Sequence, residues 1–201
     1  MQQVIEFENA IAKYFGAPFA IATDSCTHAV ELCLRLLNPD ELVIPAHTYL
    51  SIPMTAMKLG IPFTWQAESG WHKWYRLGNT KVIDAATFWQ KDGYIPFSFM
   101  CLSFQHKKHL SLGRGGAILT DNSDSAELLR KMVYDGRSRE LPWAEQNIDT
   151  IGYHYYMTPE TAELGLSKIS KAISTEPRVW SWQDYPDLRT MKVFDGKDTS
   201  K

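Results

Sequence analysis

The sequence predicts an α/β fold, with a mainly parallel sheet flanked by helices. In the first half of the chain, short apolar runs alternate with segments whose apolar residues recur at helical spacing. Of the 201 residues, 44% are hydrophobic and 22% are charged, which is enough for one globular domain with a real core. Because strands that alternate with helices usually lie parallel in one sheet, this pattern favours helices packed on the faces of that sheet.

The first half of the chain contains three expected helices and three expected strands. Gly16 suits the left-handed residue that ends a helix, and Asn38-Pro39 ends the next helix because proline cannot continue it. Pro53 is tolerated because it lies in the first turn of the third helix. The expected elements are helices at residues 4–15, 27–37 and 52–59, and strands at residues 19–22, 41–46 and 62–66.

The second half of the chain has a less regular pattern. Residues 68–79 have no clean period, so we expect a loop or hairpin there. Thr158 and Pro159 are the residue types favoured at the cap and the first position of a helix. The remaining expected elements are strands at residues 81–85, 94–104 and 115–121, and helices at residues 124–135 and 158–172. For residues 94–104, a strand that is broken near Ser98 is the alternative.

The pattern predicts one compact domain followed by a short tail. Residues 1–175 contain all the expected helices and strands, whereas residues 176–201 are rich in Pro and Trp and then highly charged. We expect a partly irregular, loosely packed tail whose end, residues 197–201, is disordered.

Composition limits the partners and the location of the protein. The net charge is −2 and no basic stripe is present, which argues against nucleic-acid binding. The three cysteines lack CxxC spacing and fit buried, reduced thiols. No apolar run approaches the ~20 residues that span a membrane, and the N-terminus lacks the features of a signal peptide. We therefore expect a cytoplasmic protein without a membrane segment.

The expected strand at residues 19–22 leads into a small polar turn and then a helix. Free backbone N–H groups at the helix start, together with hydroxyls from Ser25 or Thr27, would make a phosphate site. The alternative is plain N-capping of the helix by Ser or Thr, which is the commoner reason for these residues there.

A second candidate site is Asp84, which ends a short strand-like segment and follows the apolar residues Val82 and Ile83. The small residues Ala85 and Ala86 follow it, so a flat ring could approach closely. A carboxylate here could pair with the ring nitrogen of pyridoxal phosphate and keep that nitrogen protonated. The alternative is an ordinary strand-end aspartate that caps a turn.

A third candidate site is the lysine pair Lys107-Lys108, which follows the expected strand and precedes a glycine-rich turn at residues 113–116. A lysine at a strand-to-loop junction can form a Schiff base with an aldehyde cofactor. The alternative is a solvated, lysine-rich loop. His106 and His109 have the spacing of a ligand pair, but no third ligand lies nearby in the sequence, so we expect no metal site.

The order of phosphate turn, aspartate and lysine resembles the fold type I pyridoxal-phosphate enzymes, and more closely the DegT-type sugar-nucleotide aminotransferases. DSCTHAV at residues 24–30 is similar to NSGTAAL of that family, and GYHYYMT at residues 152–158 is similar to GYNYRMT. The likeness extends from about residue 6 to about residue 172, and its other segments are residues 44–49, 82–86 and 103–116. It implies a reduced version of the large domain of those enzymes.

Two departures from the family are visible in the sequence. Only residues 66–80 bridge a place where the family has a further helix and strand, and residues 173–201 alone follow the last helix, where the family has a C-terminal domain. The chain thus resembles a shortened family member that lacks most of the C-terminal domain. These departures bear most on substrate binding.

The resemblance implies pyridoxal 5'-phosphate as cofactor and assigns the site residues. The family spacing from Ser103 selects Lys108 for the Schiff base, with Lys107 as the alternative. The similarity of residues 82–86 assigns Asp84 to the ring nitrogen. Lys108 and Asp84 are therefore the expected catalytic residues. The other expected cofactor contacts are Ser25, Cys26, Thr27, His28 and Ser103 around the phosphate, Tyr49 against the ring, Thr87 in place of a family Gln, and His154 in place of a family Asn that reaches the neighbouring subunit's phosphate.

The resemblance also implies a function: transfer of an amino group, from glutamate as the expected donor, to a nucleotide-linked keto sugar. It implies a homodimer whose active sites are shared between the subunits. The alternative is a non-catalytic scaffold that binds the cofactor or a partner. Retention of Lys108, Asp84 and Ser103 favours the enzyme, whereas the missing elements favour the scaffold.

Overall fold

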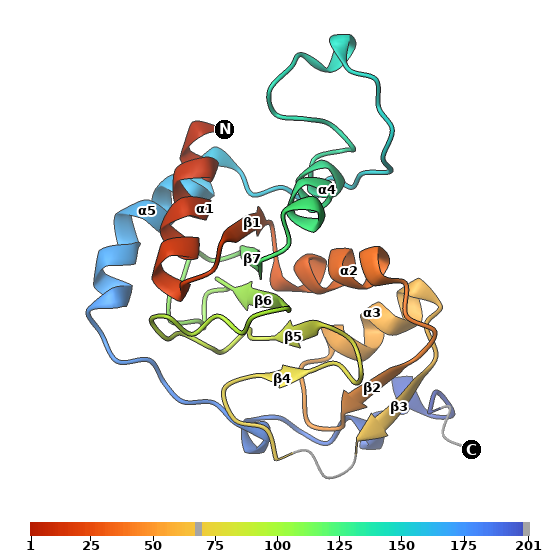
Figure 1. Ribbon diagram of the computed structural model, residues 1–201. Helices are drawn as coiled ribbons and strands as arrows, with labels where there is room; N and C mark the ends of the chain where they lie inside the picture. Colours follow the sequence, from red (N-terminus) through yellow and green to blue (C-terminus); the bar gives the residue numbers. More distant parts are fainter. Residues whose placement is uncertain (67–69, 199–201) are drawn as a thin grey trace.

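The chain folds as an α/β structure (Figure 1), as a computed structural model shows for residues 1–66 and 70–198. The loop or hairpin expected at residues 68–79 and the disorder expected at residues 197–201 therefore fall partly outside the described residues. The helices are α1 (Gln2–Phe15), α2 (Cys26–Leu37), α3 (Ser51–Leu59), α4 (Ser123–Val133) and α5 (Pro159–Ile173). Among the described residues, none of the helices is long and apolar enough to cross a membrane.

The described strands form a five-stranded sheet in the order β1-β7-β6-β5-β4 and a separate pair, β2-β3. The strands are β1 (Phe19–Thr23), β2 (Leu42–Pro45), β3 (Phe63–Gln66), β4 (Tyr75–Arg76), β5 (Val82–Asp84), β6 (Phe99–Ser103) and β7 (Gly116–Thr120). The strand expected at residues 94–104 begins late, at Phe99. The reason is a turn in which Phe97 has a φ of 59° and the Ser98 hydroxyl donates to the carbonyl of Ile95.

The α/β class is confirmed, and the main sheet is mixed. β5 and β6 pair in parallel, as do β2 and β3, whereas β7 runs antiparallel to both of its neighbours. β7 follows β6 through a loop without a crossover helix, and parallel pairing would need a longer crossover. β4 and β5 are also antiparallel, because a short turn joins them. β1, β5 and β6 nevertheless all run in one direction, so their carboxyl ends lie at the same edge of the sheet.

Helices cover both faces of the main sheet, as Figure 1 shows. Alternate residues of β7 serve the two faces: Leu119 packs with α1 and α5, whereas Ile118 packs with α2 and α4. α1 and α5 approach closely at Gly165, where an added Cβ would lie 2.4 Å from the ring of Phe7. The two hydrophobic cores thus hold the sheet rigidly, and its carboxyl edge can carry a precisely placed site.

The described part of the tail, residues 176–198, is anchored more firmly than the sequence predicts. It contains the short turns η2 (Trp182–Asp184), η3 (Leu188–Thr190) and η4 (Lys192–Phe194). Leu188 is 1% exposed and Phe194 is 3% exposed, and the backbone N–H of Leu188 donates to the carbonyl of Ala46. These buried apolar side chains hold the tail beside β2 and β3, where Figure 1 shows it in blue.

Candidate functional site

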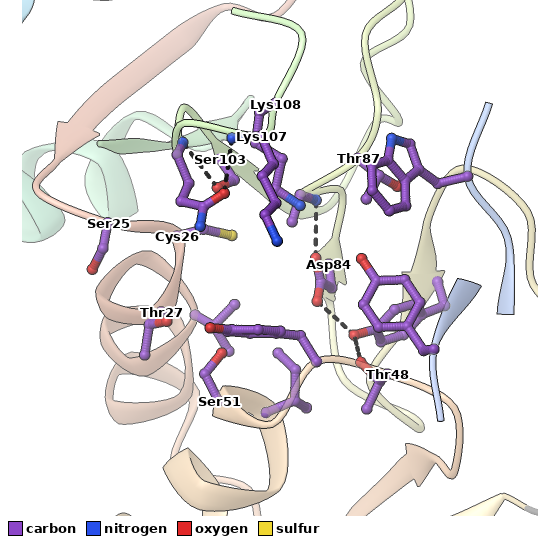
Figure 2. Close-up of a pocket in the computed structure, with 18 of the residues that line it drawn as sticks. Ser25, Cys26, Thr27, Thr48, Ser51, Asp84, Thr87, Ser103, Lys107 and Lys108 are labelled. Carbon is purple, nitrogen blue, oxygen red and sulfur yellow. Dashed lines mark hydrogen bonds between the residues drawn. The ribbon is translucent and has the colours of Figure 1, made fainter. Parts of the chain in front are cut away.

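A cavity of about 360 Å³ lies at the carboxyl edge of the sheet. Ser25 follows β1, Asp84 ends β5 and Ser103 ends β6, and all three line this cavity together with Lys108. Residues that are far apart in the sequence meet here because β1, β5 and β6 run in the same direction. Figure 2 shows their side chains around a common space.

The start of α2 forms one wall of the cavity. Ser25 is the N-cap of α2, and its side-chain oxygen accepts a hydrogen bond from the backbone N–H of His28. Gly116 lies directly against this turn, since an added Cβ would lie 2.5 Å from the backbone nitrogen of Cys26. Thr27 also lines the cavity. The N–H groups of the first helical turn and these hydroxyls can bind an anionic group such as a phosphate.

Asp84 is buried at the floor of the cavity, with 6% of its surface exposed. The backbone N–H of Ala86 donates to its Oδ1 at 2.9 Å, and the Tyr75 hydroxyl donates to its Oδ2 at 2.5 Å. Burial raises the pKa of Asp84, although the bonds from Tyr75 and Ala86 and the charge of Lys108 act to lower it. The carboxylate is thus oriented by two donors and can pair with a cation in the cavity.

The two candidate lysines both line the cavity, as Figure 2 shows. The loop after β6 is closed at its base, where the N–H of Phe104 donates to the carbonyl of Gly115 at 2.9 Å. Within the loop, the N–H of Lys108 donates to the carbonyl of Gln105. The Nζ of Lys108 lies 5.5 Å from the centre of the Trp180 ring. Geometry alone leaves both lysines within the site.

Most of the predicted cofactor contacts line the cavity. Tyr49 is 58% exposed and lies at its rim. The Thr87 hydroxyl donates to the carbonyl of Lys73 at 2.8 Å, which leaves its oxygen free to accept a hydrogen bond. The Cys26 thiol lies 3.5 Å from the carbonyl of Cys101, and burial raises its pKa well above the usual value, so it stays neutral.

Two predicted contacts are not among the residues that line the cavity. The Nδ1 of His28 lies 2.6 Å from Oδ1 of Asp24, and its ring stacks on Tyr155 at a centroid distance of 3.6 Å. His154 is exposed and its Nδ1 lies 3.2 Å from the carboxylate of Asp135. The role expected for His154 requires a second subunit, and in the single chain His28 contacts Asp24 and Tyr155 instead of the cavity. The roles of both histidines therefore stay predictions.

Sequence reasoning missed several residues of the site. Thr48, Tyr75 and Tyr185 all line the cavity, and Trp180 lines it from the tail. The tail reaches the site because its backbone pairs with residues 71–73, where the N–H of Lys73 donates to the carbonyl of Trp180 at 2.8 Å. The only signal in the sequence was the aromatic content of these irregular segments. Within residues 1–66 and 70–198, no three His, Cys, Asp or Glu side chains are grouped as a metal site would require.

A lysine, a buried carboxylate and a helix start meet in one cavity, and these are the groups that suit a phosphorylated aldehyde cofactor. The sequence model of the DegT/DnrJ/EryC1/StrS aminotransferase family matches residues 2–64 and 91–179, which is more than half of the chain. The chain therefore belongs to this family. The matched ranges leave out residues 65–90, which include Tyr75 and Asp84.

The chain shares low sequence identity with two individual relatives. The chain is 23% identical to GDP-perosamine synthase of Caulobacter vibrioides over 228 aligned positions, which cover 90% of this chain and 61% of the synthase. It is 36% identical to 3-amino-5-hydroxybenzoate synthase of Amycolatopsis mediterranei over 61 positions, which cover 29% of this chain and 16% of that enzyme. The chain thus spans about three fifths of the length of the first relative.

Solved structures show the same fold. The pyridoxal-phosphate form of the sugar aminotransferase Spr1654 from Streptococcus pneumoniae matches with a TM-score of 0.70 and 20% identity, over 86% of this chain and 60% of that one. The aminotransferase PseC from Helicobacter pylori matches with a TM-score of 0.71 and 15% identity, over 85% and 58% of the two chains. The fold is that of the fold type I aminotransferases.

Pyridoxal 5'-phosphate is the cofactor of this family, and the residues of the cavity fit it. The buried carboxylate of Asp84 suits a protonated ring nitrogen, the amine of Lys108 suits an aldehyde, and the start of α2 suits a phosphate. The space left by the missing Cβ of Gly116 allows β7 to lie against that helix start.

Proposed function

We propose that the chain is an aminotransferase that moves an amino group, with glutamate as donor, to a nucleotide-linked keto sugar. The observation that carries the proposal is that Lys108 and Asp84 line one cavity together with the start of α2. The family and the names of the relatives, among them a GDP-perosamine synthase, support the substrate class.

Each residue has a role in this proposal. Pyridoxal 5'-phosphate supplies the electron sink that stabilises a substrate carbanion. Lys108 would hold the cofactor through its side-chain amine, and the same amine, once free, would serve as the base and acid that moves a proton at the substrate. Asp84 would hold the proton on the ring nitrogen. Ser25, Thr27 and Ser103 bind the phosphate, together with the backbone N–H groups at the start of α2.

The working unit in this proposal is a dimer with shared active sites. His154 is exposed in the single chain, so it is available to donate a hydrogen bond to the phosphate held by a second copy. Residues 1–175 act as the cofactor-binding domain, and residues 176–198 supply Trp180 and Tyr185 to the cavity wall. The free thiols of Cys33 and Cys101 support a cytoplasmic location.

The test is a reaction in two halves. The purified chain is loaded with the cofactor, and glutamate is added while the absorbance of the aldehyde form is followed. A nucleotide-linked keto sugar is then supplied, and the aminated sugar is detected by mass spectrometry. We expect the aldehyde absorbance to fall on addition of glutamate, and Lys108→Ala to abolish the effect. Loss of the effect in Lys107→Ala instead would move the attachment to Lys107.

A non-catalytic scaffold is the second candidate function. It is favoured by residues 65–90, which the family match leaves out although they include Asp84. A dimeric chain that binds the cofactor tightly and yet does not respond to glutamate or to other amino donors would support the scaffold and overturn the enzyme.

A further inference from the structure

Tyr75 lies directly opposite Asp84 in the antiparallel register of β4 and β5. Directly opposed residues of such a pair project from the same face of the sheet, so the phenol is brought to the carboxylate. The hydroxyl of Tyr75 lies 2.5 Å from Oδ2 of Asp84. Tyr75 is 7% exposed, so water competes little for this hydrogen bond.

The turn between β4 and β5 fixes this register. The N–H of Leu77 donates to the carbonyl of Val82 at 2.9 Å, and the N–H of Thr80 donates back to the carbonyl of Leu77 at 3.1 Å. Gly78 in this turn has a φ of 50°, and an added Cβ would lie 2.9 Å from the backbone nitrogen of Val43. The turn is therefore packed against β2, and β4 cannot shift by one residue without disrupting it.

Thr48 extends the hydrogen bond into a directional chain. Its hydroxyl bonds to the hydroxyl of Tyr75, and Thr48 is 1% exposed. Figure 2 shows Thr48 and Asp84 on the same side of the cavity, joined by dashed hydrogen bonds through a third side chain. A phenol has one proton, and an ionised carboxylate can only accept. Tyr75 therefore donates to Asp84, and Thr48 donates to the oxygen of Tyr75. Burial raises the pKa of Tyr75 well above its usual value, so the phenol stays protonated and remains a donor.

We propose that Tyr75, supported by Thr48, is a positioning residue that orients the carboxylate of Asp84 and holds it as an anion toward the ring nitrogen of the cofactor. The inference rests on the proposed cofactor role of Asp84. Without these donors the buried carboxyl group would favour its neutral form, which cannot hold the ring nitrogen protonated. Of these two residues, Tyr75 lies within residues 65–90, which the family match leaves out, and Thr48 lies within a matched range.

The other titratable groups around Asp84 do not replace this donor. Lys108, on the loop after β6, contributes a favourable charge but no hydrogen bond to Asp84 among the described contacts. Cys26 at the start of α2 and Cys101 on β6 are buried, and burial raises the pKa of each thiol, so both are neutral. Burial likewise raises the pKa of Tyr185 in the tail, so its hydroxyl is neutral too.

The first test titrates Asp84 in the cofactor-free chain. The chain is labelled with carbon-13 at the aspartate carboxyl groups, and Asp84→Asn identifies the signal of Asp84 in NMR spectra recorded against pH. Tyr75→Phe removes the donor and keeps the ring that packs on Trp71 at 5.0 Å. Tyr94→Phe is the matched control, since it removes a hydroxyl that donates to the carbonyl of Ser98 outside the cavity.

We expect the pKa of Asp84 to rise in Tyr75→Phe, to rise less in Thr48→Val, and to be unchanged in Tyr94→Phe. An Asp84 signal that titrates in Tyr75→Phe as it does in the parent chain overturns the inference. If Tyr75→Phe fails to fold, Thr48→Val decides the question in the same way. This measurement needs no cofactor, so its outcome does not depend on the proposed function.

The second test follows the ring nitrogen itself in the loaded protein. Cofactor labelled with nitrogen-15 in the ring reports whether this nitrogen is protonated. We expect the nitrogen-15 signal to move part of the way toward that of an unprotonated ring nitrogen in Tyr75→Phe. In Asp84→Asn we expect it to move the whole way. A protonated nitrogen in Asp84→Asn would overturn the proposed role of Asp84, and with it the positioning role of Tyr75, whatever the first test shows for the hydrogen bond.

Discussion

Ser103, the last residue of β6, pairs directly with Gly116, the first residue of β7. This pairing closes the loop that carries Lys108, and it also brings Gly116 against the start of α2. A Cβ added at Gly116 would lie 2.5 Å from the backbone nitrogen of Cys26. One backbone register thus positions the lysine, the Ser103 hydroxyl and the helix start around a single cavity.

Gly116→Ala tests this close approach. The added Cβ would lie 2.5 Å from backbone atoms of Ser25 and Cys26, which cannot move away without shifting α2. We expect the free energy of unfolding to fall by about 1–3 kcal/mol, as in other overpacked sites. Urea unfolding measures it. Gly70→Ala is the control, because its Cβ would meet no atom of residues 1–66 and 70–198 within 4 Å. Equal stability of the two variants would contradict the packing described.

Thr27→Val and Ser103→Ala test the phosphate site. Each change removes a hydroxyl from the cavity wall, and the loss of a hydrogen bond to a charged group should weaken cofactor binding by about 1–3 kcal/mol. Affinity is measured by titrating the cofactor into the cofactor-free variants. Ser111→Ala is the control, since its hydroxyl donates to the carbonyl of His106 within the same loop. A double variant that binds as tightly as the parent would place the phosphate elsewhere.

Glu31 makes stability depend on pH. Burial acts to raise its pKa, but hydrogen bonds from Lys58 and Arg35 outweigh this, and the pKa in the folded chain is lowered from 4.5. Such a group stabilises the fold above its unfolded pKa, and this contribution is lost as the pH falls through the lowered folded value. We expect Glu31→Gln to destabilise the chain by about 1–3 kcal/mol at pH 7.

Urea unfolding of the parent and of Glu31→Gln at several pH values measures this difference. It should be largest above pH 4.5 and should shrink as the pH falls below that value. Glu127→Gln is the control for loss of a glutamate charge, since Glu127 lies exposed on α4. A difference that stays constant from pH 7 to acid would contradict the ion-pair account of Glu31.

A mixture of two inactive variants tests the shared active site. Lys108→Ala lacks the attachment residue, and His154→Ala lacks the residue expected to reach the neighbouring subunit. After subunit exchange, one site of each mixed dimer regains both residues, so part of the activity should return. Light scattering measures the size of the assembly. A monomer that still binds the cofactor would contradict the dimer.

Much of this site could be predicted from the sequence, because its residues follow strand ends. Asp84 and Ser103 end apolar runs, and Ser25 has the residue type that caps a helix. Strand direction could not be predicted in the same way. β7 is antiparallel because the connection from β6 is a loop, and the apolar pattern of a buried strand does not distinguish the two orientations.

The role of Tyr75 could not be predicted from the sequence, since β4 is two residues long and too short for a period to be visible. Its contact with Asp84 depends on the register that the turn at residues 77–81 imposes. Trp180 enters the site only because the tail pairs with residues 71–73, and such a long-range contact leaves no local signal.

Covalent attachment of the cofactor to Lys108 is the central claim, and borohydride reduction tests it most directly. The chain is loaded with pyridoxal 5'-phosphate, reduced, digested and analysed by mass spectrometry. We predict the added mass on Lys108, its absence in Lys108→Ala, and its presence in Lys107→Ala. An adduct on another lysine of the parent chain, or no adduct with the cofactor in excess, would contradict the account.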